Sequence, residues 1–548
     1  MTRFLALAGL FAALSACSEG PPVRPACPAG KVCLELGNTA DPVSLDPHIY
    51  TGTNEDRIGA DLLVGLTQAD PEGRPIPGMA TSWRASADGK VWTFHLRDAK
   101  WSDGVPMSAD DFVYSLRRLL DPKTGAQYAS LMYIIQNAEA VNAGKLPLEA
   151  LGVRAIDPHT LEIRLVHPAP YLPELAKHQT MYPVPRHVIE KWGDAWSQPG
   201  HFVGNGPFTP VSWRLGDHLR AVKNPLFWDA ASVCVDQIDY FPIIDSIAAE
   251  RRVRRGELDT NDRIEPSRVA FLRQPGQIPQ YVRVHTYLGV YYLAFNTKDV
   301  PAFHDRRVRI ALSMSLDRDF MADKLLRGVN RPAYTLVPPG VANYTPPSPP
   351  VWASWSLARR QAAARALLTQ AGYGPSNPLK VEIKTSNSVN AQVLMPSIQS
   401  DWQAIGVKAS LIQEEAQISY QDFRLRDFQV ASAAWIADYN DPMSFLYVLQ
   451  STTGSQNYGD YASPAYDALL AQADNEPDIQ KRAAILARAE SLMLADAPIA
   501  PLYFAVSTNL VNPRITGFVD NIVDQHKERY LCVKGGPKPS LTPANAAR

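Results

Sequence analysis

The cysteines are the residues of this sequence whose position says most about their chemistry. The chain contains five of them. The first, Cys17, follows Leu14-Ser15-Ala16 at the end of a short apolar run that begins after Arg3. One positive charge, an apolar run and small residues in that order are typical of an export signal, and the run is shorter than the ~20 residues of a membrane-spanning helix. We therefore expect residues 1–16 to be a signal peptide and the protein to be exported.

Cys17 supports two interpretations. It is incidental if the signal is an ordinary cleaved one. Alternatively, the four residues ending at Cys17 resemble the lipobox of bacterial lipoproteins, whose cysteine becomes the first residue of the mature chain and carries acyl groups. We favour lipidation of Cys17, with the proline-rich residues 17–26 as an extended tether. Several acyl chains hold a protein on a bilayer, since each buried methylene contributes ~0.8 kcal/mol. We expect a membrane anchor, on the periplasmic side or at the cell surface.

The remaining cysteines are Cys27, Cys33, Cys234 and Cys532. An even number in an oxidising compartment favours disulfides, and four cysteines allow three pairings. We favour Cys27–Cys33, which closes a small loop, and Cys234–Cys532, which ties the C-terminal region to the body. Cys234 as a buried free thiol is the alternative.

No motif for catalysis or for metal binding stands out. The chain has no phosphate-binding glycine loop, no HExxH and no GxSxG. The 11 histidines are scattered, and we find none paired with a carboxylate at metal-ligand spacing. A triad assembled only in space stays open. We therefore expect that the protein is not an enzyme, has no catalytic residue, and binds no metal ion or cofactor.

The composition argues against some classes of binding partner. The net charge is -1, with 46% hydrophobic and 20% charged residues. A net charge near zero lacks the excess of basic residues that is typical of a nucleic-acid-binding protein. No second apolar stretch approaches membrane-spanning length. The chain has 548 residues, and its mature part is long enough for two or three domains. We expect the protein to be a monomer.

Strands and helices alternate along the chain. Residues 91–97 and 161–165 alternate large apolar with polar residues, which predicts strands. Residues 109–120 predict a helix capped by Ser108, with Asp111 three residues later. Further amphipathic helices are predicted over 306–316 and 356–371, and a long proline-rich loop over 337–350. The mixture indicates α/β or α+β domains.

A set of ordered segments resembles the oligopeptide-binding proteins of bacterial extracellular solute-binding protein family 5, which are related to dipeptide and nickel binders. The strongest block runs through Trp92–Arg97, Lys100–Gly104 and Ser108–Ser115. The other matching segments are 45–48, 61–66, 77–83, 205–208, 223–228, 305–309 and 437–442. Together they span about 38–512, nearly the whole mature chain.

The resemblance implies a two-lobed, periplasmic-binding-protein type II-like fold of the α/β class. Two crossing strands join the lobes around a cleft, and an extra domain is grafted on the first lobe. Carried over, lobe I comprises 27–63, 188–288 and 506–548, the extra domain 64–187, and lobe II 289–505. Closure of the lobes buries the ligand.

The resemblance also implies the ligand-binding residues. Asp438 matches the aspartate that meets the α-ammonium of a peptide in this family. The strand before it, Ala433 to Ala437, should pair with the peptide backbone, which gives affinity without reading side chains. Tyr128, Tyr292, Trp435 and Tyr503 lie at or near cleft positions of the family, although each could be a core residue.

The far end of the expected pocket departs from the family. Arg424 aligns approximately with an arginine that helps to hold the peptide carboxylate. A second such arginine is replaced by Ser432, and two acidic positions by Thr51 and Ala294. A cysteine pair of those relatives falls at Gly289 and Ile436. Arg263 or Lys298 could replace the missing positive charge.

The implied function is capture of a short peptide with a free α-amine and its delivery to the permease subunits of an ABC importer, which use separate ATPase subunits. Alternatives are a binder of murein peptides, opine-like conjugates or metal chelates, and a receptor that presents ligand to a sensor. A remote alternative is an exported hydrolase, for which no motif was found.

Overall fold

The computed structural model describes residues 27–536. The predicted signal peptide, the tether and Cys17 lie outside these residues. Within them, no helix combines the length and the apolar character needed to cross a membrane.

One mixed sheet of 11 strands runs through both lobes, in the order β15-β14-β16-β12-β17-β11-β1-β10-β9-β8, with β13 beside β17. The strands are β1 (Cys33–Asn38), β8 (Phe208–Arg214), β9 (His218–Lys223), β10 (Gln237–Pro242), β11 (Thr260–Asn261), β12 (Val282–Phe295), β13 (Arg331–Pro332), β14 (Lys380–Ser386), β15 (Lys408–Glu414), β16 (Val430–Ile436) and β17 (Ile499–Val511).

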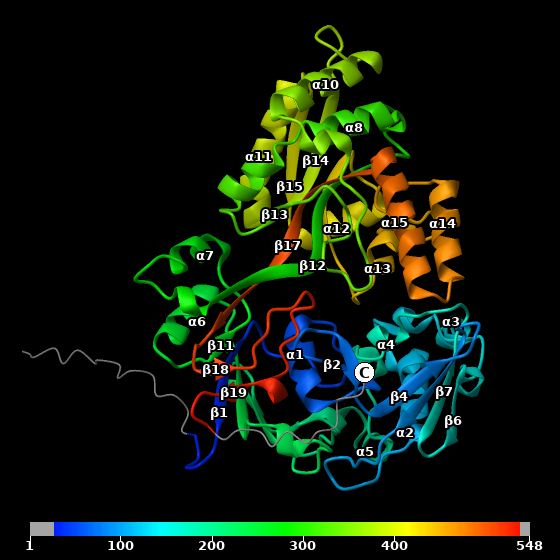
Figure 1. Ribbon diagram of the computed structural model, residues 1–548, viewed down its shortest axis with the longest axis vertical. Helices are drawn as coiled ribbons and strands as arrows, with labels where there is room; N and C mark the ends of the chain where they lie inside the picture. The colour runs from blue at the N-terminus through cyan, green and yellow to red at the C-terminus, as the bar shows by residue number, and fades with distance from the viewer. Residues whose placement is uncertain (1–26, 537–548) are drawn as a thin grey trace, which may run out of the picture.

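The long antiparallel strands β12 and β17 connect two lobes (Figure 1). The upper lobe contains β13 to β16 with α8 (Arg306–Met314), α9 (Arg318–Phe320), α10 (Leu357–Gln370), α11 (Val389–Ala404), α12 (Ala416–Leu425), α13 (Met443–Leu446), α14 (Pro464–Asp474) and α15 (Ile479–Asp496). The lower lobe contains β1 and β8 to β11 with α1 (Thr53–Leu62), α5 (Arg186–Trp192), α6 (Ser246–Arg254) and α7 (Pro266–Leu272). The pairing of β12 with β17 shifts register between Thr286 and Val290, where the strands pass from one lobe to the other.

An extra domain lies beside the lower lobe (Figure 1). Its four-stranded sheet has the order β4-β5-β7-β6. The elements are β4 (Ala80–Ala85), β5 (Val91–Leu96), β6 (Val153–Asp157) and β7 (Thr160–Arg164), with α2 (Ala109–Leu120), α3 (Ala138–Asn142) and α4 (Leu172–Leu175). The two small sheets are formed by β2 (Thr67–Ala69) with β3 (Pro75–Pro77), and by β18 (Ile515–Thr516) with β19 (Cys532–Val533). The two-lobed α/β architecture with a grafted domain is confirmed, while the residue boundaries of the domains stay a prediction.

Several elements follow their sequence patterns closely. On β5 the alternating Trp92, Phe94 and Leu96 are buried, as expected for one face of a strand. Helix α2 begins at a capping box between Ser108 and Asp111, which satisfies free amide groups at the helix start. Helix α8 ends at Met314, two residues before the predicted end, because Asp317 caps the next short helix.

The hydrophobic cores explain why the lobes are separate bodies. One cluster unites Leu36 of β1 with Phe94 of β5, so the lower lobe and the extra domain share a core. Two other clusters fill the upper lobe, around Tyr292 and around Ile383. The lower cluster and the two upper clusters are separate cores, which favours relative motion of the lobes.

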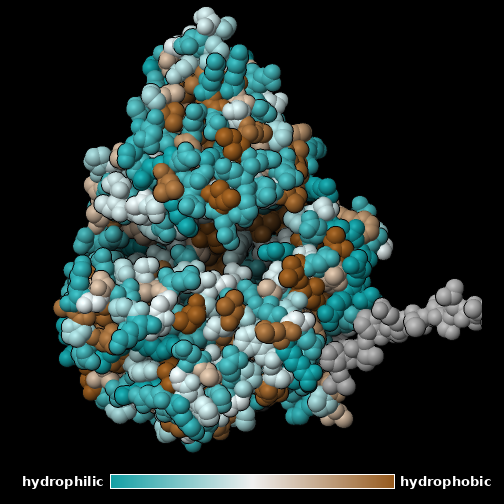
Figure 2. All heavy atoms as spheres, turned by 180° about the vertical axis from the view of Figure 1, so that it is seen from behind, coloured by the Kyte–Doolittle hydropathy of each residue, from teal (hydrophilic) through white to brown (hydrophobic). Residues whose placement is uncertain are grey.

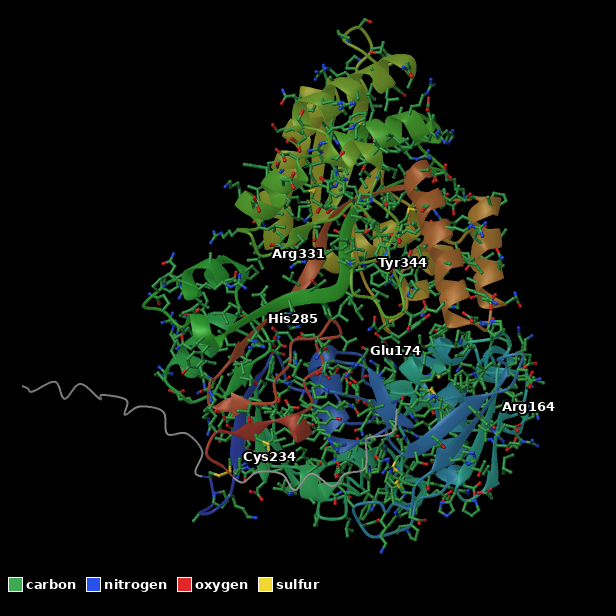
Figure 3. The ribbon with its side chains drawn as sticks, in the orientation of Figure 1. Arg164, Glu174, Cys234, His285, Arg331 and Tyr344 are labelled. Atoms are coloured by element: carbon green, nitrogen blue, oxygen red, sulfur yellow. A yellow bond between two sulfur atoms is a disulfide. The ribbon has the colours of Figure 1, made fainter. Side chains whose placement is uncertain are left out.

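The favoured cysteine pairs lie together. Cα atoms are 5.7 Å apart for Cys27 and Cys33 and 5.3 Å apart for Cys234 and Cys532, within the range of disulfides. The second pair connects the segment before β10 to β19. Figure 3 shows Cys234 in the lower lobe.

Candidate ligand-binding cleft

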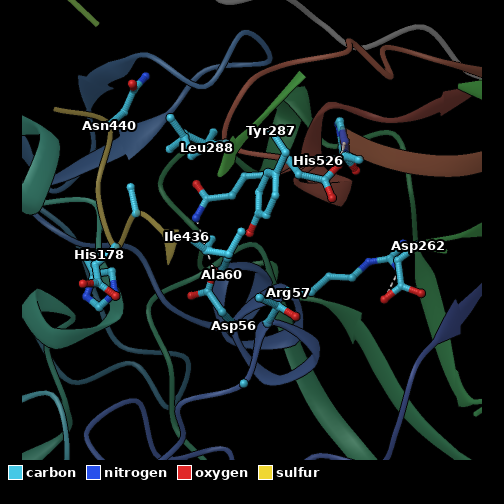
Figure 4. Close-up of a pocket in the computed structure, with 18 of the residues that line it drawn as sticks. Asp56, Arg57, Ala60, His178, Asp262, Tyr287, Leu288, Ile436, Asn440 and His526 are labelled. Atoms are coloured by element: carbon cyan, nitrogen blue, oxygen red, sulfur yellow. Dashed lines mark hydrogen bonds and ion pairs between the residues drawn. The ribbon is translucent and has the colours of Figure 1, made fainter. Parts of the chain in front are cut away.

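A cavity of about 580 Å³ lies where the two lobes and the extra domain meet. From behind, the surface is hollowed between the lobes (Figure 2). The cavity is lined by the start of α1, the end of β16, the middle of β12, the second half of β17 and the segment 523–528. Figure 4 shows Tyr287 of β12 and Asp56 of α1 projecting into it. Its volume lies within the ~300–1,000 Å³ of small-molecule sites.

Asp438 lines this cavity just beyond the end of β16. Its backbone N–H donates to Ser444 Oγ at 3.2 Å. Within residues 27–536, no side chain forms an ion pair or hydrogen bond with its carboxylate. Burial raises the pKa of Asp438 to about 6, because a charged carboxylate is disfavoured away from water. The side chain is therefore a half-buried anion without a cation.

Four predicted residues lie on the cavity: Asp438, Ala437, Tyr128 and Thr51. Tyr128 packs edge-on against His178, with ring centroids 5.6 Å apart. Arg263 also lines the cavity, whereas Lys298 pairs with Asp460 at 3.5 Å. Asp438 and Arg263 therefore line the same cavity, whereas Lys298 does not.

The other predicted ligand-binding residues do not line the cavity in this arrangement. Tyr292 and Tyr503 are 3% and 2% exposed and belong to the upper-lobe cores, as does buried Ala433. Trp435 donates its indole N–H to the carbonyl of Ser444 at 2.6 Å. The remaining two are Ser432, opposite Leu293 in the sheet, and Arg424, exposed on the last turn of α12. As ligand contacts they stay predictions.

Gly289 and Ile436 are direct partners between β12 and β16. A Cβ atom on Gly289 would lie 2.3 Å from Ile436 Cδ1 and 2.8 Å from Ala505 Cβ. The isoleucine side chain therefore occupies the space over the glycine. The resemblance placed a cysteine pair of relatives at these two positions, and their direct pairing agrees with that placement.

The cavity floor carries a charged network that the sequence analysis missed. Arg57 of α1 donates from Nε to Glu528 at 3.3 Å and lies 3.9 Å from Asp262. Burial, followed by the neighbouring Asp61, raises the pKa of Glu528 well above its ordinary value. Burial lowers the pKa of Lys527 to about 8. These residues come from segments far apart in the chain and carry no local motif, so only the fold brings them together.

The expectation that no histidine lies with a carboxylate at metal-ligand spacing is wrong. His285 of β12 lies with Asp524 and His526, and one ligand atom from each lies within 4.8 Å of the others. Asp524 and His526 are only two residues apart, so that spacing was visible in the sequence. His285 lies on β12, far from them in the sequence, and could not be assigned from spacing.

The comparisons with known proteins agree with this geometry. The family model for bacterial extracellular solute-binding proteins, family 5, matches residues 74–457. The periplasmic oligopeptide-binding protein OppA of Escherichia coli is 38% identical over 94% of this chain and 95% of that protein. The periplasmic murein peptide-binding protein MppA of the same species is 37% identical over 88% of this chain and 89% of that protein.

Solved structures give the same result. The unliganded open form of MppA superposes with a TM-score of 0.82 at 35% identity, covering 92% of this chain and 99% of that one. Haemophilus influenzae OppA in complex with the peptide RPPGFSPFR has a TM-score of 0.74 at 34% identity, covering 92% of this chain and 99% of that one. The match to the open form agrees with the hollow between the lobes. This chain belongs to the bacterial extracellular solute-binding proteins, family 5.

Proposed function

We propose that this protein is a non-enzymatic receptor that captures short peptides by their free α-amine and delivers them to an ABC importer. The unpartnered carboxylate of Asp438 in the interlobe cavity is the observation that carries the proposal. An ammonium group in contact with Asp438 would provide the missing countercharge, and lobe closure would remove both charges from water. Buried charges in proteins are paired for this reason.

The edge of β16 supports the same ligand class. Residues Val430 to Ile436 pair with β12 on one side. On the other side β14 pairs only with Val430 and Ala431. Among the described strands, none pairs with that edge from Ser432 to Ile436, immediately before Asp438. Its free backbone groups could therefore hydrogen-bond an extended peptide as an added strand.

The far end of the ligand is assigned to Arg263. Its side chain lines the cavity, and no carboxylate of residues 27–536 lies within ion-pair distance of it. Ser432 and Thr51 leave neutral polar groups where relatives carry charges. This arrangement supports a peptide carboxylate held by Arg263 in place of the family arginine.

The remaining parts of the proposal rest on the sequence. Cys17 carries the lipid anchor, the protein is exported and functions as a monomer, and permease subunits accept the ligand. The two cysteine pairs form disulfides in the oxidising compartment. Incorporation of a labelled fatty acid into the wild-type chain, but not into Cys17→Ser, tests the anchor.

A murein peptide is the second candidate ligand. The similarity to MppA, in sequence and in the open structure, favours it over opine-like conjugates and metal chelates. A murein peptide with a free α-amine would use the same Asp438 contact. Competition between a murein tripeptide and ordinary tripeptides for the cleft separates the two ligand classes.

Calorimetry of peptide binding tests the proposal. Asp438→Asn should weaken binding by over a hundredfold, since removing one partner of a buried ion pair costs ~3–5 kcal/mol. N-acetylation of the peptide should weaken binding to the wild type equally and have little further effect on the variant. The exposed Asp98→Asn is the matched control. A loss below threefold for Asp438→Asn would exclude the α-amine assignment.

A further inference from the structure

The histidine–carboxylate cluster on the lower part of the cleft has no role in the proposed peptide contact. His285 lies on β12 where that strand enters the lower lobe (Figure 3). Asp524 and His526 belong to the segment between β18 and β19 and line the cavity. One strand and a loop far from it in the sequence therefore meet at the cavity wall.

The distances in the cluster suit a single metal ion. Nε2 of His526 lies 2.9 Å from Oδ1 of Asp524, and Nε2 of His285 lies 3.3 Å from the same oxygen. Tetrahedral zinc with bonds of ~2.0–2.1 Å places neighbouring ligand atoms about 3.3 Å apart. Both histidines thus converge on one carboxylate oxygen, and the three ligand atoms lie within 4.8 Å of one another.

The ring nitrogens are buried and poorly satisfied by the protein. The side chains of His285 and His526 are 10% and 8% exposed. Both ring nitrogens of His285 and Nδ1 of His526 lack a hydrogen-bond partner within the described chain. Nε2 of His285 lies within ion-pair distance of Asp524, at 3.3 Å, and Nε2 of His526 is hydrogen-bonded to the same carboxylate at 2.9 Å. A buried polar atom without a partner calls for an explanation, and a bound ion is one that suits two imidazoles beside a carboxylate.

Outer contacts hold Asp524 and His526 in place. Asp520 Oδ1, which accepts a hydrogen bond from Arg283, lies 3.6 Å from Nδ1 of His285. Asn509 donates to Asp524 at 2.9 Å, and the ring of Phe518 stacks on that of His526 with centroids 3.9 Å apart. A carboxylate behind a metal-binding histidine and a hydrogen-bonded ligating carboxylate are usual in metal sites.

We propose that His285, Asp524 and His526 bind one divalent transition-metal ion at the wall of the cleft. Two imidazoles and one carboxylate suit Zn²⁺, Ni²⁺ or Cu²⁺ and do not suit Mg²⁺ or Ca²⁺, which prefer oxygen ligands. Three protein ligands leave a coordination position for water or for an atom of the cleft's ligand. The site is separate from Asp438, so it goes beyond the proposed peptide contact.

Titration of the untagged mature protein with Zn²⁺, followed by calorimetry, tests the site. The expected result is one saturable site with a Kd below about 10 μM, whose occupancy raises the Tm and is reversed by a chelator. His526→Gln, His285→Gln and Asp524→Asn should each weaken binding at least tenfold. Exposed His95→Asn on β5 is the matched control and should bind like the wild type.

Electron paramagnetic resonance of the Cu²⁺-loaded protein gives a direct readout that does not depend on the stability of a variant. The wild type should show coupling to two imidazole nitrogens, and His526→Gln to one. The absence of saturable binding of Zn²⁺, Ni²⁺ and Cu²⁺ by the wild type would overturn the proposal, as would unchanged binding by all three variants. Asp438→Asn should retain the metal, and loss of metal binding in that variant would also overturn the assignment.

Discussion

The carboxylate of Asp441 accepts hydrogen bonds from both Nη atoms of Arg482, at 2.7 and 2.9 Å. The two side chains are 4% and 1% exposed. Asp441 is three residues beyond Asp438, and Arg482 lies on α15. The guanidinium also lies 4.5 Å from the ring centre of Tyr171 in the extra domain, which stacks on Tyr439. This ion pair fixes the loop that presents Asp438 and places it against the extra domain.

Arg482→Met should therefore destabilise the protein strongly. Removal of one partner leaves Asp441 buried and unpaired, a loss of about 3–5 kcal/mol in unfolding free energy. Urea denaturation followed by tryptophan fluorescence measures it. Arg307→Met removes a surface pair with Asp305, whose side chains are 45% and 31% exposed, and should cost less than about 1 kcal/mol. Equal losses in the two variants would contradict a structural role for the buried pair.

Asp438→Asn should stabilise the ligand-free protein at neutral pH. Burial raises the pKa of Asp438 from 3.8 to about 6, so ionisation disfavours the folded state. The cost is absent below pH ~4, develops as the pH rises towards 6 and is constant above it. Allowing for partial exposure, we expect a gain of about 1–2 kcal/mol at pH 7.5. Thermal unfolding at pH 4 and pH 7.5 measures it, and a gain independent of pH would contradict the assignment.

The two cysteine pairs should differ in their contribution to stability. A cross-link stabilises mainly by restricting the unfolded chain, and more for longer loops. Cys234 and Cys532 are separated by 298 residues, and Cys27 and Cys33 by 6. We expect losses of about 5 kcal/mol for Cys234→Ser/Cys532→Ser and about 2 kcal/mol for Cys27→Ser/Cys33→Ser. Urea denaturation of the two double variants compares them, with mass spectrometry of the non-reduced chain to establish each bond.

The local elements could be predicted because their patterns are local. The alternation at Trp92, Phe94 and Leu96 and the capping box at Ser108 and Asp111 depend on a few neighbouring residues. The family resemblance then supplied the two lobes and the position of Asp438. Neither step depended on knowing which residues meet across the cleft.

The rest of the site depends on tertiary contacts. Arg57, Asp262 and Glu528 converge from segments more than 200 residues apart. His285 of β12 meets Asp524, in the segment between β18 and β19, only in the folded chain. Tyr292 and Tyr503 were expected near the cleft, but a buried aromatic ring on a strand is equally suited to a core. A single sequence does not separate these two roles, because both need a large apolar side chain.

Peptide affinity should fall both at acid pH and at alkaline pH. We call these the acid limit and the alkaline limit. Asp438 binds an ammonium group only when ionised, and its pKa in the empty protein is about 6. The α-amine of a peptide binds only when protonated, with an ordinary pKa of ~8. Affinity should therefore be highest between these values and fall about tenfold per pH unit on either side, because the competent fraction of one partner falls by that factor.

Calorimetry between pH 4.5 and 9 separates the two limits by removing one group at a time. Tyr128, Tyr287 and Tyr447 interact electrostatically with Asp438, and burial raises the pKa of each above its ordinary value, so they stay neutral over this range. Asp438→Asn should lose the acid limit and leave only weak binding. An N-acetylated peptide should lose the alkaline limit with the wild type. An acid limit that persists unchanged in Asp438→Asn would show that another group receives the amine, since asparagine does not titrate.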